Sequence, residues 1–161
     1  MKTLSVKKVL CPDGCSAEQI PALFDAAQIP FQQIDCVNWK DYPYTPDVRF
    51  RIAHTGDAIL IHYRVTEKSV RAVAPADNGR VWEDACAEFF VQPTDEKKYY
   101  NFECNCAGTL LIEYGIPGNR EHALLETVGQ VERWASLGRI PFEERLGECS
   151  WHCLLYTSPS P

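Results

Sequence analysis

The sequence lacks the features that would place it in a membrane or on nucleic acid. No apolar run among its 161 residues approaches the roughly 20 residues that cross a bilayer as a helix, and no block of Lys and Arg is present. The chain carries 16 Lys and Arg against 22 Asp and Glu, an acidic balance that disfavours a phosphate backbone as a partner. We therefore expect no membrane span, no nucleic-acid partner and one globular domain.

The eight cysteines also lack a pattern, since they form neither a CxxC motif nor a paired zinc spacing. The N-terminus has no apolar segment of the kind found in signal peptides, because Lys2, Lys7 and Lys8 interrupt it. As the chain stands, these features predict a cytoplasmic location with reduced cysteines that act as small apolar side chains. A metal chelate or a strained pair at Cys104 and Cys106 is the alternative.

The last nine residues differ in composition from the rest of the chain. Residues 153–161 carry no charge, end in alternating Pro and Ser, and resemble one translated frame of a transposase-type sequencing-library adapter. We therefore expect a domain over residues 1–152 and a non-native, adapter-derived tail over residues 153–161. The natural protein would then continue past His152. A genuine disordered Ser/Pro tail is the alternative.

Hydrophobic periodicity predicts an all-β protein. Residues 16–19 (SAEQ) have the form of a capping box, which predicts one short helix near residues 17–28 that ends at Pro30. Alternation with period two predicts strands at residues 48–53, 59–66, 86–92, 99–105 and 109–114, whereas residues 121–131 fit either a helix or a strand. No long amphipathic helix separates the strands, so we expect an antiparallel, jelly-roll-like β-sandwich, truncated at its C-terminus.

Polar and aromatic residues gather in two neighbouring predicted strands. Because side chains alternate along a strand, Glu103 and Asn105 share a face, and Glu88 lies between same-face neighbours Cys86 and Phe90. Sugars bind to a flat aromatic face combined with convergent carboxylates and amides. The candidate carbohydrate-binding residues are Trp82, Glu88, Glu103 and Asn105. In the competing interpretation, Trp82 is buried inside the sandwich and the acids are solvated.

Two ordered motifs resemble a known family. WEDACAEFFV (residues 82–91), followed by YYNFECN (residues 99–105) and GTL (residues 108–110), is similar to the signature of the family 9 carbohydrate-binding modules and their DOMON-like relatives. The resemblance extends from about residue 35 to residue 142. It implies a β-sandwich that binds mono- or oligosaccharides from plant polysaccharides without catalysis, beside glycoside hydrolases, in support of carbohydrate catabolism.

The resemblance also implies roles for particular residues. By position, Trp82 corresponds to one aromatic wall of the family's sugar slot, and Glu88 to a carboxylate that hydrogen-bonds the sugar. The chain departs from the family where Glu103 stands, because members can place an Arg there, and the second aromatic wall is expected beyond His152. A calcium site is the one cofactor that the resemblance allows, with ligands that the sequence does not assign.

Three other functions remain open at this stage. Glu88 and Glu103 could serve as the paired carboxylates of a glycoside hydrolase. Some DOMON-like sandwiches carry haem, and with Met1 as the only methionine the ligands would come from the histidines, which are His54, His62, His122 and His152. The sandwich edge or acidic face could also bind another protein.

Overall fold

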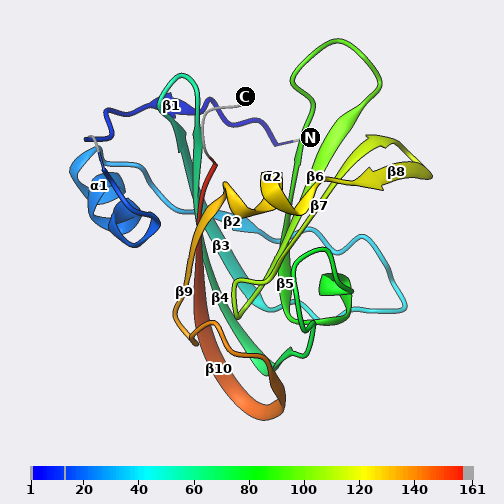
Figure 1. Cartoon of the computed structure of the whole chain (residues 1–161). Coiled ribbons are helices and arrows are strands. Elements are labelled where there is room, and N and C mark those ends of the chain that lie inside the picture. Colours follow the sequence, from blue (N-terminus) through cyan, green and yellow to red (C-terminus); the bar gives the residue numbers. More distant parts are fainter. Residues whose placement is uncertain (1, 13, 158–161) are drawn as a thin grey trace.

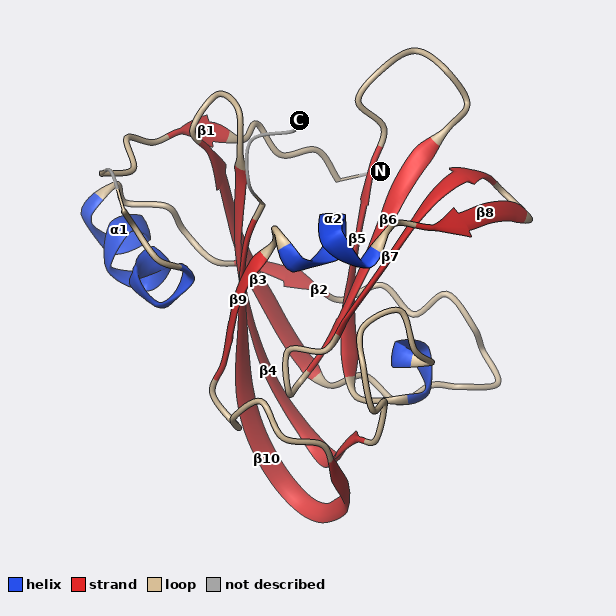
Figure 2. Ribbon diagram, in the orientation of Figure 1, coloured by secondary structure: helices blue, strands red, loops and turns tan. Residues whose placement is uncertain are grey.

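Two β-sheets pack face to face in the computed structural model, which describes residues 2–12 and 14–157 (Figure 1 and Figure 2). Sheet A has the order β1-β3-β4-β10-β9, with β2 also paired to β3, and all its pairs are antiparallel except β1 with β3. Sheet B is an antiparallel meander in the order β5-β6-β7-β8. The strands of sheet A are β1 (Lys7–Lys8), β2 (Gln32–Ile34), β3 (Asp47–His54), β4 (Ile59–Ala72), β9 (Glu132–Ala135) and β10 (Phe142–Tyr156), and those of sheet B are β5 (Cys86–Val91), β6 (Tyr99–Asn105), β7 (Leu110–Ile116) and β8 (Asn119–His122). The prediction of a β-sandwich is confirmed.

The helices of the described chain are short. The predicted N-terminal helix begins as the 3-10 helix η1 (Ala17–Gln19), where the Gln19 side chain accepts the Ser16 N–H at 2.9 Å, and continues as α1 (Ile20–Ala26). The other two are the 3-10 helix η2 (Val81–Glu83), just before β5, and α2 (Leu125–Gly129). Within residues 2–12 and 14–157, no helix combines the length and the apolar character needed to cross a membrane.

The main core lies between the two sheets. Alternate residues of β4 and β10, including Tyr63, Val65 and Trp151, meet Phe102 and Cys104 of β6 there. A second cluster packs α1 onto the outer face of sheet A, where Phe24 contacts Leu60 and Leu154. All eight cysteines are free thiols, and Cys104 and Cys106 are buried as apolar side chains.

The end of the described chain belongs to the sheet. Residues 153–156 continue β10 between β4 and β9, with Cys153 and Leu155 in the main core and Leu154 under α1. The rest of the predicted tail, residues 158–161, lies outside the described residues. The adapter origin of this segment concerns the coding DNA and stays a prediction.

Candidate functional site

Sheet B has two chemically different faces. Ala87, Phe89 and Phe102 point into the core, whereas the opposite face carries the row that we call the polar face, which comprises Glu88, Phe90, Asn101, Glu103 and Glu113. The strand register brings these residues together: Glu88 lies opposite Glu103, Phe90 opposite Asn101, and Asn101 opposite Glu113. Two of the predicted site residues, Glu88 and Glu103, are therefore direct cross-strand neighbours.

Two hydrogen-bond acceptors on the polar face lack a donor. The Asn101 and Glu103 side chains are almost fully covered, at 1% and 6% exposure, and Asn101 Nδ2 donates to Glu103 Oε1 at 2.7 Å. The remaining oxygen of each, Asn101 Oδ1 and Glu103 Oε2, has no partner in the described chain. A buried polar atom without a partner costs about 1–3 kcal/mol, so both oxygens would gain from a donor, and a ligand can supply one once the groups that cover them move aside.

Two carboxyl groups on this face, those of Glu88 and Glu103, have raised pKa values. Burial raises the pKa of Glu88 and outweighs the opposing charge of Arg120. Burial also raises the pKa of Glu103, the Asn101 hydrogen bond partly offsets it, and the nearby charges of Glu88 and Glu113 raise it further. Glu113 on the same face forms an ion pair with Arg120 Nη2 at 2.9 Å. Within the described chain, Glu88 and Glu103 have no such ion pair.

Trp82 lies at the end of the polar face. Its neighbour Val81 is fully buried against Leu111 and Cys86, two residues that share the side of sheet B on which the polar face lies. η2 therefore covers this end of the sheet, and Trp82 extends from it with 50% of its surface exposed. The interpretation that Trp82 is buried inside the sandwich is wrong, because Trp151 occupies the core.

Hydrogen bonds fix the loop that carries Trp82. The Asp84 carboxylate accepts the N–H groups of Val73 and Ala74 at 2.9 and 3.0 Å. Asp77 accepts the Leu110 N–H at 3.0 Å and two hydrogen bonds from the Arg133 guanidinium at 2.8 and 2.9 Å. These contacts hold the backbone of the Trp82 loop in place before any ligand arrives, which reduces the entropy lost on binding.

The structure keeps Asn105 away from the surface. Its side chain is fully buried, and its Oδ1 accepts the N–H groups of Ala107 and Thr109 at 3.0 and 2.8 Å. Its Nδ2 donates to Asp84 at 2.9 Å. Asn105 thus shares its face with Glu103 as the alternation predicts, but its amide holds the β6–β7 turn and the Trp82 loop in place.

Two residues of the polar face are absent from the sequence-based list of candidates. Asn101 carries one of the unpartnered oxygens, and Phe90 is an exposed aromatic ring whose centroid lies 5.8 Å from that of Tyr99. Their positions could have identified them, because residues two apart in a strand share a face. Phe90 lies two residues after Glu88, and Asn101 lies two residues before Glu103. With Trp82 and Phe90, exposed aromatic side chains occur on both sides of Glu88 along the chain.

Two observations on the described residues concern the predicted metal and haem ligands. These residues contain no group of three or more His, Cys, Asp or Glu side chains that could hold a metal ion, so no ligand set for calcium is assigned. On the outer face of sheet A, His62 bonds Arg51 Nη2 through Nδ1 at 3.1 Å and His152 Nδ1 through Nε2 at 3.0 Å. Both nitrogens of His62 are occupied, which leaves none for a haem iron.

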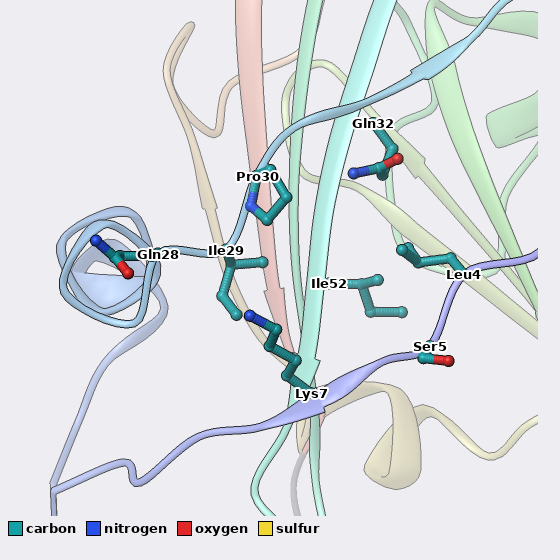
Figure 3. Close-up of a pocket in the computed structure, with 8 residues that line it drawn as sticks. All are labelled: Leu4, Ser5, Lys7, Gln28, Ile29, Pro30, Gln32 and Ile52. Carbon is teal, nitrogen blue, oxygen red and sulfur yellow. The ribbon is translucent and has the colours of Figure 1, made fainter.

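A hollow of about 200 Å³ lies apart from the polar face. Figure 3 shows it between the N-terminal segment, the α1–β2 connection and β3, with Leu4, Lys7, Pro30, Gln32 and Ile52 among its lining residues. None of the residues that line it is aromatic or acidic. The hollow therefore lacks the ring faces and carboxylates that sugar recognition uses.

Comparison with known proteins decides the family. A family model described as carbohydrate-binding family 9 matches residues 18–158. The chain belongs to carbohydrate-binding family 9. This family 9 domain is also similar to the crystal structure of a presumed carbohydrate-binding protein from Bacteroides uniformis ATCC 8492, with 60% sequence identity and a TM-score of 0.93 over 96% of this chain and 71% of that chain. Among curated proteins, none matches significantly.

Proposed function

We propose that this family 9 domain binds a neutral mono- or oligosaccharide, derived from plant polysaccharide, at the polar face of sheet B and without catalysis. Trp82 stacks on the sugar ring, and Glu88, Glu103 and Asn101 accept hydrogen bonds from its hydroxyl groups. Asn105 acts indirectly by fixing the Trp82 loop to the β6–β7 turn. Family membership and the similarity to a presumed carbohydrate-binding protein support the ligand class.

The observation that carries the proposal is the pair of unpartnered acceptors, Asn101 Oδ1 and Glu103 Oε2. Each sugar hydroxyl can donate one hydrogen bond, so hydroxyls that displace the groups covering these oxygens would satisfy acceptors that the chain leaves unpaired. Glu88 lies beside them without a cation of its own. A face on which two carboxylates lack cations favours ligands rich in donors and disfavours uronic acids, whose carboxylates would meet like charge.

The same proposal gives the domain a supporting place in carbohydrate catabolism. A module without catalytic groups of its own contributes by holding the saccharide, which raises the local concentration of that saccharide for an enzyme. The partner of matching chemistry is a glycoside hydrolase that acts on the bound saccharide.

A catalytic alternative is favoured by one observation, the direct pairing of Glu88 with Glu103. Glycoside hydrolysis uses two carboxyl groups that flank the scissile bond about 5–10 Å apart. Here the two residues are adjacent on one face of a sheet, which suits gripping a ligand from one side. Release of reducing ends from xylotetraose or cellotetraose tests this directly. We expect none, and turnover that Glu88→Gln abolishes would replace binding by catalysis.

Isothermal titration calorimetry tests the proposed function. The protein is titrated with glucose, xylose, galactose, glucuronate, xylotetraose and cellotetraose, and the titrations are repeated with Glu88→Gln and with Glu144→Gln, a control at an exposed position of β10. We expect at least one neutral sugar to bind, glucuronate not to bind, and Glu88→Gln alone to weaken binding. If folded wild-type protein binds none of the neutral sugars, the proposal is overturned.

A further inference from the structure

A second group of exposed aromatic side chains lies outside the candidate site. Residues 35–46 connect β2 to β3 without a helix or strand, and Figure 1 shows this loop, in cyan, extending away from sheet A. Trp39 and Tyr42 are 69% and 77% exposed, and Tyr44 and Val37 are each about half exposed. Single exposed apolar residues are ordinary on a surface, whereas four within eight residues mark a binding surface.

These side chains surround a common hollow. It has a volume of about 170 Å³, and Trp39, Tyr42 and Tyr44 line it together with the polar residues Asp35, Asn38 and Thr45. The lining thus combines flat ring faces with a carboxylate, an amide and a hydroxyl group. This is the combination that recognises a sugar ring, because rings cover its C–H face and polar groups meet its hydroxyls.

The loop is anchored at several points, so its backbone and the Tyr44 ring are held before a ligand arrives. The β2–β3 pairing fixes its ends at Ile34 and Val48. The Lys68 N–H of β4 donates to the Tyr44 hydroxyl at 2.9 Å, and the Lys68 ammonium lies 5.6 Å from the centre of the same ring. The Tyr42 N–H donates to the Trp39 carbonyl at 3.1 Å, which closes a turn between the two most exposed rings. A long loop fixed in this way is typical of a functional loop.

We infer that the β2–β3 loop is a further saccharide-contacting surface, in which Trp39 and Tyr42 stack on a sugar ring. The hydroxyls of that sugar are bonded by Asn38 and by the Asp35 oxygen that does not pair with Lys2. The inference rests on the proposed function and extends it to an oligosaccharide. It places sugar contacts on a loop anchored to β4, whereas the candidate site is built on sheet B and η2. Loss of one stacking ring from this loop is expected to weaken oligosaccharide binding about two- to tenfold.

Fluorine NMR of the full chain labelled with 5-fluorotryptophan tests the inference. The chain has four tryptophans, so each resonance can be assigned from a Trp→Phe variant and then followed as xylotetraose or cellotetraose is added. We expect the resonances of Trp39 and Trp82 to shift and that of the buried Trp151 to stay, which also reports an intact fold. Tyr42→Ala is expected to weaken binding, while Ile140→Ala, at another exposed position, leaves it unchanged.

The other outcomes separate the two proposals. A shift of Trp82 with no shift of Trp39 would overturn the inference and leave the proposed function standing. Absence of any shift in a folded protein would overturn both. A Trp39 resonance that moves with protein concentration, and not with added sugar, would assign the loop to a protein interface and overturn the inference.

Discussion

Replacement of the exposed ring of Trp82 by alanine should weaken sugar binding about tenfold. A tryptophan side chain presents about 250 Å², and half of Trp82 is exposed, which leaves about 125 Å² for contact. A sugar ring that stacks on one face covers about half of that, or about 60 Å². At about 25 cal/mol per Å² the lost contact is worth about 1.5 kcal/mol, which corresponds to about a tenfold rise in Kd.

Calorimetric titration of the tetrasaccharide that binds wild-type protein is the assay. Trp82→Phe keeps a smaller ring and should fall between wild type and Trp82→Ala, and Ile140→Ala provides a control at another exposed apolar position. Because the Trp82 ring is half exposed, Trp82→Ala should unfold at nearly the same urea concentration as wild type. A folded Trp82→Ala protein with unchanged Kd would refute stacking at this position.

Further predictions follow from buried polar groups and from the chain end. The folded-state pKa of Glu103 is raised by burial, so its charge destabilises the fold at neutral pH. Glu103→Gln should therefore raise the free energy of unfolding at pH 7. In urea titrations this gain in free energy should disappear below the unfolded-state pKa of about 4.5. Burial lowers the pKa of His62 to about 3 from 6.5. The free energy of unfolding should therefore fall as the pH drops below 6.5, by about 2 kcal/mol at pH 5. In urea titrations, His62→Gln should lack this decrease with pH. Asn105→Ala removes three hydrogen bonds and leaves the Ala107 and Thr109 N–H groups without their acceptor, so it should cost on the order of 3 kcal/mol in urea unfolding, whereas the exposed control Asn119→Ala should cost little. Sequencing of an independent clone should show an open frame that continues past His152 with codons other than those for residues 153–161, and a clone that reproduces the nine residues and a stop codon would contradict the adapter origin.

Much of the fold was predictable because several strands have one apolar face and one polar face. In β3 and β6 the apolar residues alternate with polar ones, so period-two reasoning finds both strands. β10 follows a different rule, since its first half is exposed on both faces while Trp151, Leu154 and Leu155 are buried on both sides of the sheet. Neither half alternates, so the sequence indicates only the start of a strand at residues 149–152 and not the full fifteen-residue strand. The segment 121–131 was ambiguous because it holds the end of β8 and the short helix α2, and β9 begins directly after it.

The candidate site shows a similar division between local and long-range information. Alternation within a strand places Glu103 with Asn101 and Glu88 with Phe90, but only the register of β5 against β6 shows that Glu88 faces Glu103. The burial of Asn105 also has a non-local cause. Its amide accepts hydrogen bonds from a turn in which Gly108 adopts φ +72°, a conformation that favours glycine. Residue type and position in the strand alternation cannot alone separate this structural role from a binding role.

The central claim is that a sugar binds to the polar face of sheet B. Amide NMR of isotope-labelled protein, recorded while the tetrasaccharide is added, tests it most directly. We predict that the largest shifts fall on η2, on β5 and β6, and on the side-chain amide of Asn101. Shifts confined to the hollow beside Pro30 and Gln32, or to the outer face of sheet A around His62, would contradict the claim.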